Sequence, residues 1–253
     1  MSARVLLMGV PEGGLEVLYP FMSQMPLLKK GKWINQWEDD VREELEIMKP
    51  GEVRQGFIYH SEGMKQYLNE QQIRRVFIYR DPRDMITSFL FSIVDDRKHL
   101  HHKYFREHLK TVDQQLLKLV TGFMETRLVS KKYGVNQLGY GDVTEYFTRY
   151  LRWMEDPDTC VIRYENLAGG PDKLQHELTR LVDYLWPDLE RGRHKVRKVD
   201  YLKHVLQMDM WESSTSLPVG EWKEHFTEEV KDAFKQVAGE LLIFLGYEKD
   251  FAW

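Results

Sequence analysis

Short apolar runs recur along this chain and predict buried strands. Four of them stand out, at residues 5–10, 56–60, 75–80 and 159–164. The first run is closed by Pro-Glu-Gly-Gly, which is a turn signal, and the third leads directly into Asp81-Pro82, a pair that starts helices. The pattern therefore predicts short strands that each lead into a loop or a helix.

Helices are predicted between and after these strands. Mixed apolar and polar stretches with helical spacing occupy residues 15–25, 61–71, 83–94, 172–185 and 227–245. Ser61 is placed to act as an N-cap, and Gly246 is placed to end the last helix. Residues 33–48 are predicted as loop and helix, and residues 95–153 as mostly helical.

The alternation of strands and helices predicts an α/β fold. We expect a P-loop-like, three-layer architecture in which a central, mainly parallel sheet carries helices on both faces. Residues 1–253 are predicted to form a single domain. Ligands of such sheets bind at the carboxyl ends of the strands, so candidate site residues should follow Val10, Tyr59, Tyr79 and Ile162.

Composition narrows the classes of partner. Apolar residues make up 42% of the 253 residues and charged residues 30%, as in ordinary soluble domains. The net charge of −4 provides no global basic field, so we expect neither nucleic-acid nor membrane binding, although a local basic patch is not excluded. No apolar run is long enough to span a bilayer or matches a signal peptide, and we expect a cytoplasmic protein. The single cysteine, Cys160, is predicted to be a buried strand thiol.

The position of Arg80 in the sequence suggests a phosphate-binding site. It lies where a buried strand ends and a helix begins, and the exposed N–H groups of a helix N-terminus bind phosphate. An arginine there adds a bidentate donor. Ser88 follows two helical turns later and could contribute a hydroxyl. The alternative is an arginine paired with Asp81 or Asp84 and an ordinary helix serine.

Four segments, taken in order, resemble the cytosolic sulfotransferase family. Residues 76–89 resemble its segment of strand, Arg, Asn/Asp, Pro/Ala, Lys/Arg, Asp, three variable residues, Ser and Tyr/Phe. Tyr164-Glu165-Asn166-Leu167 resembles Tyr-Glu-Asp-Leu, and residues 220–227 resemble Gly-Asp-Trp-Lys-Asn-His-Phe-Thr. Residues 57–60 occupy the place of the strand that ends in the family's catalytic histidine. The resemblance spans nearly the whole chain.

This resemblance implies a sulfotransferase that uses 3′-phosphoadenosine-5′-phosphosulfate (PAPS). Arg80 and Ser88 would hold the 3′-phosphate of PAPS or of its product, 3′-phosphoadenosine 5′-phosphate (PAP), and Tyr164 would lie near the adenine. His60 would be the general base, since an imidazole titrates near neutral pH; the alternative is a histidine that caps a helix or is bonded in the core. The acceptor would be a small molecule or a carrier-bound substrate, and the oligomeric state is not predicted.

The first loop departs from the family pattern. Where the family reads Pro-Lys-Ser-Gly-Thr-Thr-Trp, this chain reads Pro11-Glu12-Gly13-Gly14-Leu15-Glu16-Val17. Pro11 and Gly14 match, and backbone N–H groups of Gly13 and Gly14 could still form an anion cradle. A glutamate at the lysine position would repel a phosphosulfate. These changes support a competing hypothesis, a binding or scaffold protein on the same fold that has lost catalysis.

A second departure lies before Gly220. The family's Arg-Lys-Gly aligns with Thr215-Ser216-Leu217, whose hydroxyls could donate hydrogen bonds but carry no charge. We expect Thr215 and Ser216 to contact the nucleotide, and Lys29, Lys30, Lys32 or Arg83 could supply the missing charge.

Three histidines in the middle of the chain, His99, His101 and His102, are possible metal ligands. A solvated loop is favoured, and no metal site is predicted. The basic run 191–198 is interpreted as a solvated face, with an acidic acceptor as the alternative.

Overall fold

The computed structural model describes residues 3–25, 28–34, 38–187, 193–212 and 219–253. The chain divides into two compact units, each described by itself below. Unit 1 comprises Met1–Arg80 and Arg149–Val219, and unit 2 comprises Asp81–Thr148 and Gly220–Trp253. None of the described helices combines the length and the apolar character needed to cross a membrane.

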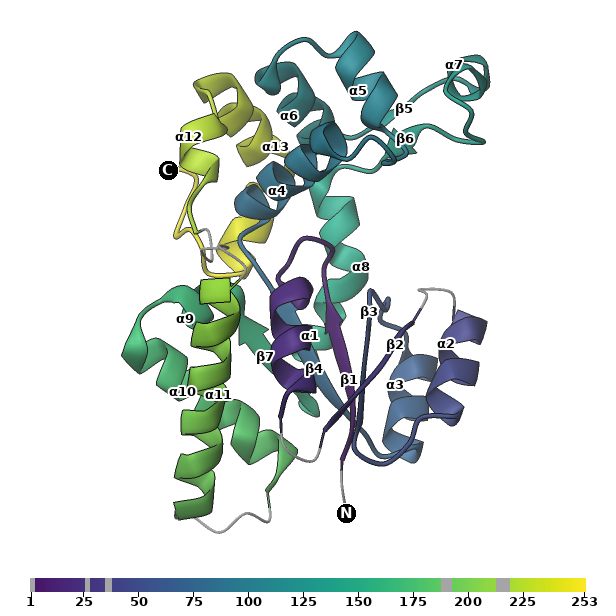
Figure 1. Ribbon diagram of the computed structural model, residues 1–253. Coiled ribbons are helices and arrows are strands. Elements are labelled where there is room, and N and C mark those ends of the chain that lie inside the picture. The colour runs from purple at the N-terminus through teal and green to yellow at the C-terminus, as the bar shows by residue number, and fades with distance from the viewer. Residues whose placement is uncertain (1–2, 26–27, 35–37, 188–192, 213–218) are drawn as a thin grey trace. The chain divides into compact units, whose positions relative to one another are not determined.

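Unit 1 is built around a five-stranded sheet in the order β2-β3-β1-β4-β7 (Figure 1). The strands are β1 (Arg4–Gly9), β2 (Lys29–Ile34), β3 (Glu52–Gly56), β4 (Ile73–Tyr79) and β7 (Thr159–Arg163). Every neighbouring pair is parallel. The prediction of an α/β fold with a parallel central sheet is therefore confirmed.

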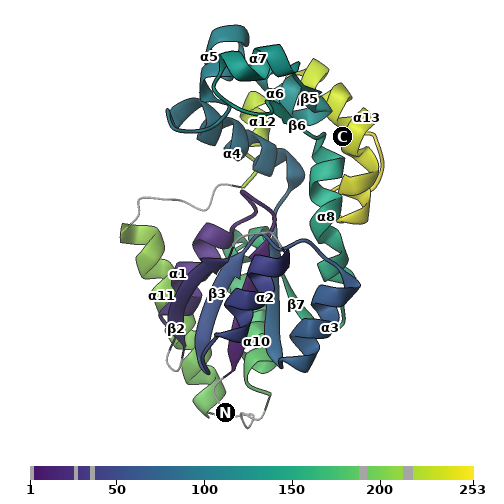
Figure 2. The ribbon, with the colours of Figure 1, turned by 90° about the vertical axis from the view of Figure 1, so that its right-hand side faces the viewer.

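Helices cover the sheet of unit 1 on both sides. The helices are α1 (Leu15–Ser23), α2 (Glu38–Glu46), α3 (Glu62–Glu70), α9 (Tyr164–Ala168), α10 (Pro171–Leu185) and α11 (Arg193–Glu212). Alternate strand residues such as Val5, Leu7 and Ile78 join one apolar cluster with α1, α10 and α11, while Figure 2 shows α2 and α3 on the other side. Cys160 is buried in this cluster, and burial raises the pKa of its thiol to about 11.

Unit 2 is mostly helical, as predicted for the middle of the chain. It contains α4 (Pro82–Asp95), α5 (His102–His108), α6 (Val112–Thr121), α7 (Arg127–Lys132), α12 (Trp222–His225) and α13 (Glu228–Phe244). Two short antiparallel strands, β5 (Phe123–Met124) and β6 (Gly139–Tyr140), pair with each other. Helix α8 (Val143–Glu155) contains the point where the chain returns to unit 1.

The predicted helix ends agree with the structure. The Ser61 hydroxyl accepts a hydrogen bond from the Met64 N–H at 3.0 Å, and so caps α3. Asp81 caps α4 in the same way, accepting from the Arg83 N–H at 2.9 Å, with Pro82 as the first helical residue. Gly246 follows α13 with a φ of 70°, which favours glycine.

One strand prediction was wrong, and one strand was missed. Residues 56–60 do not form a strand; the strand is β3, which ends at Gly56. The sequence of β3, Glu-Val-Arg-Gln-Gly, lacks the apolar run that indicates a buried strand. Arg54 is nevertheless buried, because Glu44 and Glu52 neutralise its charge. Strand β2 was missed because it is a lysine-rich edge strand, and lysines on an edge discourage pairing with other chains.

Candidate functional site

The candidate residues of unit 1 follow four neighbouring strands. The first loop follows β1, Arg80 follows β4, and Tyr164 follows β7, while His60 lies four residues beyond the end of β3. Since β3, β1, β4 and β7 are adjacent and parallel, their carboxyl ends meet at one edge of the sheet. These residues therefore lie at the carboxyl-terminal edge of the sheet, as expected for the ligand site of a parallel sheet.

The first loop requires both of its glycines. The Gly13 N–H donates to the Val10 carbonyl at 2.8 Å, and a Cβ on Gly13 would lie 2.6 Å from that oxygen. Gly14 has a φ of 103°, a conformation that side chains rarely adopt. A Cβ on Gly14 would lie 2.4 Å from Cδ2 of Tyr164. The loop is thus packed directly against the Tyr164 ring.

Arg80 lies on the same aromatic ring. Its guanidinium carbon is 4.7 Å from the centroid of the Tyr164 ring, and both side chains are only 2% exposed. This cation–π contact fixes the guanidinium beside the ring that Gly14 touches. Gly14, Arg80 and Tyr164, chosen from three separate segments of the sequence, therefore converge within unit 1.

Glu16 places a carboxylate in the first turn of α1. The backbone N–H groups of Glu16 itself and of Gly14 lie close to the carboxylate. Although Glu16 is exposed, desolvation by the surrounding protein is the largest influence and raises the pKa of Glu16. The charge of Glu12 raises this pKa further, whereas the two backbone N–H groups and the charge of Arg80 lower it. An internal negative charge therefore lies near the Gly14 N–H, which is expected to receive an external anion.

His60 is held in place by α8. Its backbone N–H donates to the Arg149 carbonyl at 3.1 Å, and its ring packs edge-on against the Trp153 ring, with the ring centroids 4.7 Å apart. Trp153 in turn donates to the Ile58 carbonyl at 2.9 Å. Within the described residues, the buried Nδ1 of His60 has no hydrogen-bond partner.

Burial lowers the pKa of His60, and the nearby charge of Arg152 acts in the same direction, while the carboxylate of Glu62 acts against them. A lowered pKa keeps the imidazole neutral at pH 7. The ring is therefore in the protonation state that a general base needs.

Three further predicted site residues are not part of the described unit 1. Ser88 is half-buried on α4 and belongs to unit 2. Thr215 and Ser216 lie outside the described residues. The roles of these three residues stay predictions.

The two most specific family-like segments are joined inside unit 2. The Asp84 carboxylate accepts hydrogen bonds from the Gly220 N–H at 2.7 Å and from the Trp222 N–H at 3.0 Å. Asp84 is 1% exposed, so this buried carboxylate anchors the second segment to the first turn of α4. The sequence did not reveal this role, because the two segments lie far apart along the chain.

Arg83 is unsuited to replace the missing phosphate-binding charge. It is 3% exposed, pairs with Asp81 and Glu248, and packs between the rings of Trp222 at 4.1 Å and Trp253 at 4.6 Å. Its charge is therefore already neutralised within unit 2.

The first two lysines of β2 are also poorly placed. Lys29 and Lys30 begin β2, at the edge of the sheet opposite the first loop, and Lys30 lies 5.7 Å from the Tyr19 ring centroid. These two residues were reasonable candidates in sequence, but the parallel direction of the strands separates them from Gly14.

The histidines of the middle segment pack among aromatic rings. His101 is 6% exposed, and its ring centroid lies 5.5 Å from that of His99 and 5.8 Å from that of Phe123. Burial and the charge of His99 lower the pKa of His101 to about 4. No group of three potential metal ligands occurs among the described residues. The expectation of a solvated loop was wrong for His101, which belongs to the core of unit 2.

A groove of about 1010 Å³ lies at the opposite edge of the sheet in unit 1. It is lined at the starts of β1 and β4 by Arg4, Ile73 and Arg74, and by the end of α10 at Tyr184 and Leu185. Neither Gly14, Arg80 nor Tyr164 lines it. This groove is therefore separate from the candidate site.

The parallel sheet, with a glycine loop after its first strand, defines a P-loop-like α/β protein. More specifically, the chain belongs to the sulfotransferase domain family, whose model matches residues 2–245. The structure of mouse sulfotransferase SULT7A1 complexed with PAP is similar, with a TM-score of 0.62 and 14% identity over 97% of this chain and 85% of that one.

Retinol dehydratase in complex with androsterone and inactive cofactor PAP has a TM-score of 0.51 and 11% identity, over 94% of this chain and 80% of that one. At these identities the two structures establish the fold. No curated protein sequence matches the chain.

Proposed function

We propose that this chain binds PAP and PAPS and transfers the sulfuryl group of PAPS to a hydroxyl or amine of an acceptor. The observation that carries this proposal is the convergence of Arg80, Tyr164 and Gly14 in a chain of the sulfotransferase family. Both similar structures contain PAP, which supports the choice of nucleotide.

The described residues fit one end of the nucleotide better than the other. Arg80 supplies a fixed, permanently charged donor for a 3′-phosphate, and Tyr164 supplies an aromatic surface beside it. Ser88 keeps its predicted role as a hydroxyl donor to the same phosphate. At the other end, the glycine cradle is present, but Glu12 and Glu16 carry negative charge where a phosphosulfate would lie.

In this proposal His60 accepts the proton of the attacking acceptor. When bound, PAPS supplies an activated sulfuryl group. The protein contributes positioning, together with electrostatic stabilisation of the charge that develops on the leaving oxygen. The lowered pKa of His60 keeps a proton acceptor available at neutral pH.

The carboxylates of the first loop favour a second candidate, a nucleotide-binding protein without sulfuryl transfer. Glu12 replaces the family's lysine, and the Glu16 carboxylate lies near the Gly14 N–H. Such a protein would use Arg80 and Tyr164 to bind PAP, and it would not stabilise a leaving phosphosulfate.

An assay that needs no natural acceptor separates the two candidates. With p-nitrophenyl sulfate as donor and PAP as recipient, transfer breaks the bond between sulfur and the phenol oxygen, forms a bond between sulfur and a 5′-phosphate oxygen, and releases p-nitrophenol. PAP-dependent release of p-nitrophenol that is lost in His60→Ala supports the first candidate. PAP binding without any release supports the second, and the absence of both contradicts the two candidates together.

A further inference from the structure

Charge is distributed very unevenly along this chain. Residues 97–140 contain nine Arg and Lys against three Asp and Glu, whereas the whole chain has a net charge of −4. All of residues 97–140 lie in unit 2. The net charge alone predicts no contact with an anionic surface, but it conceals a strongly basic region.

The basic region carries a projecting tip formed by β5, α7 and β6 (Figure 1). We call residues 123–140 the basic tip. Its three cations are Arg127, Lys131 and Lys132, all exposed, and residues 126–140 contain no Asp or Glu. None of these three cations forms an ion pair within the described part of the chain.

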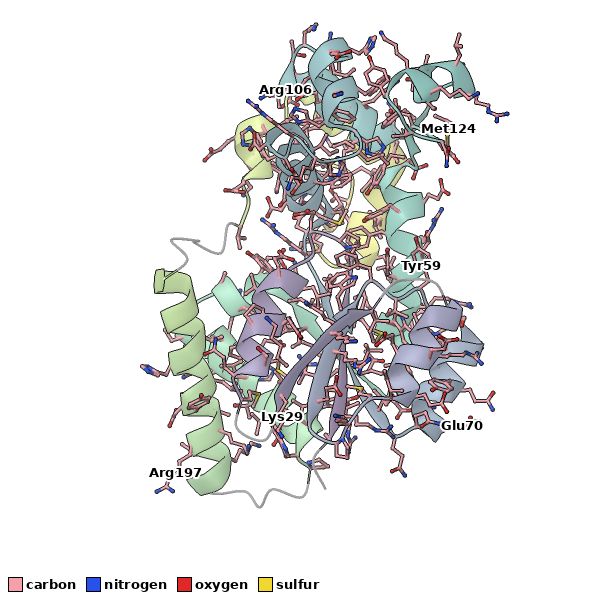
Figure 3. The ribbon with its side chains drawn as sticks, turned by 45° about the vertical axis from the view of Figure 1, so that its right-hand side comes forward. Lys29, Tyr59, Glu70, Arg106, Met124 and Arg197 are labelled. Carbon is pink, nitrogen blue, oxygen red and sulfur yellow. The ribbon has the colours of Figure 1, made fainter. Side chains whose placement is uncertain are left out.

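The same tip exposes apolar side chains. Leu128 is 81% exposed and Met124 is 64% exposed, the two highest values among the large apolar residues of the described chain. Met124 is labelled in Figure 3. Single exposed apolar residues are ordinary. Two of them beside three unpaired cations form a surface suited to a specific partner.

Internal hydrogen bonds fix which side of α7 faces outward. Ser130 is 1% exposed; its hydroxyl accepts from the Leu138 N–H at 2.9 Å and donates to the Thr126 carbonyl at 3.0 Å. Because Ser130 faces inward, Leu128, Lys131 and Lys132 are left on the outer side. The nearby carboxylates are occupied, since Glu107 accepts from Tyr133 and Glu125 pairs with Lys118.

We propose that the basic tip binds the surface of an anionic lipid bilayer. Lysines are attracted to anionic headgroups, and an apolar side chain among them can enter the boundary between headgroups and acyl chains. A protein partner fits less well, because lysines are depleted from the centres of protein interfaces. This inference rests on unit 2 alone and does not depend on the proposed function.

A fluorescent probe at position 128 tests the proposal directly. Cys160 is the only cysteine and is buried, so in a Leu128→Cys variant the environment-sensitive dye NBD attaches at the tip. Vesicles of phosphatidylcholine with about 30% phosphatidylserine should increase and blue-shift the emission, and pure phosphatidylcholine vesicles should not. Unchanged emission with both kinds of vesicle would overturn the proposal.

Cosedimentation of unlabelled variants with the same vesicles gives a second readout. A K131Q/K132Q variant should bind about thirtyfold more weakly, since each cation near an anionic surface contributes roughly a fivefold factor. Leu128→Ser should weaken binding by about tenfold. The matched controls, K173Q/K249Q for charge and Ile47→Ser for an exposed apolar residue, should leave binding unchanged.

Two further results would contradict the proposal. The first is vesicle binding that K131Q/K132Q leaves intact. The second is binding to soluble poly-glutamate, but not to vesicles, that K131Q/K132Q abolishes; it would assign the basic tip to an acidic protein instead. Because all the altered side chains are exposed, the thermal midpoints of the variants should match the wild type and exclude misfolding.

Discussion

The backbone N–H of Gly14, at the start of the first helix, lies close enough to the Glu16 carboxylate to lower the pKa of that carboxyl. Gly14 is also the residue whose missing Cβ leaves room for the Tyr164 ring. A glycine loop before a helix normally offers its N–H groups to an external anion. Here the Glu16 carboxylate lies near one of them, so a phosphate at this end of the site would meet its negative charge.

Replacing Glu16 should therefore strengthen PAP binding. A Glu16→Thr variant removes the competing charge and restores a hydroxyl of the kind the family carries there. We expect the affinity for PAP, measured by isothermal titration calorimetry, to rise by about tenfold, since removal of one close like charge is worth roughly 1 kcal/mol or more near a surface. The control Glu229→Gln, an exposed carboxylate of unit 2, should leave the affinity unchanged. Weaker binding by Glu16→Thr would show that the carboxylate assists the ligand.

The close approach of the first loop to Tyr164 predicts a large cost for a single methyl group. Gly14→Ala would place a Cβ 2.4 Å from the ring and force alanine to a φ of 103°. We expect the free energy of unfolding to fall by about 2 kcal/mol or more, measured by urea denaturation. Gly134→Ala is the matched control, since Gly134 also has a positive φ but nothing lies within 4 Å of its Cβ position. A similar loss in both variants would mean that backbone conformation, and not contact with Tyr164, explains the glycine.

Much of the fold could be predicted because its strongest signals are local. The apolar run of β4 and the Asp81-Pro82 helix start need no knowledge of distant residues. Strand β3 was not predicted, because Arg54 is buried only through its ion pairs with Glu44 and Glu52. The periodicity of apolar residues does not reveal such pairs. The same holds for the site. Arg80 and Tyr164, both candidates from the sequence, contact each other, whereas the position of the Glu16 carboxylate near the Gly14 N–H depends on a side-chain conformation that no sequence pattern specifies.

The buried His101 should make the protein sensitive to acid. Its pKa is lowered from 6.5 to about 4, so the folded state binds fewer protons than the unfolded state between these values. Above about pH 6.5 the titration of His101 leaves the free energy of unfolding unchanged. As the pH falls toward 4, this titration lowers the free energy of unfolding by on the order of 3 kcal/mol. A His101→Phe variant should lose less stability than the wild type between pH 7 and about pH 4.5 in urea denaturation. Parallel losses in the two proteins would remove His101 from the explanation of acid sensitivity.

His60 should affect turnover and not nucleotide affinity. In the p-nitrophenyl sulfate assay, His60→Gln should lower the rate by about a hundredfold and leave the dissociation constant of PAP unchanged. Transfer in this assay runs opposite to the proposed reaction, so His60 must carry a proton that it donates to the departing phenol oxygen. Because the pKa of His60 is lowered, the wild-type rate should rise as the pH falls below 6.5. A rate that falls as the pH drops below 6.5, or a His60→Gln enzyme with normal turnover, would assign the proton transfer to another group.

The proposed function depends on a nucleotide phosphate that binds Arg80, just beyond the end of β4 and beside the ring of Tyr164. Calorimetric titration of PAP into the wild type, Arg80→Gln and Ser88→Ala tests it most directly, with the thermal midpoint of each variant as the control for folding. We expect PAP to bind the wild type, and to bind about 50-fold more weakly to Arg80→Gln and about fivefold more weakly to Ser88→Ala, as for the loss of a charged and a neutral hydrogen bond. PAP binding that Arg80→Gln leaves unchanged, or no binding by either the wild type or Glu16→Thr, would rule out this site.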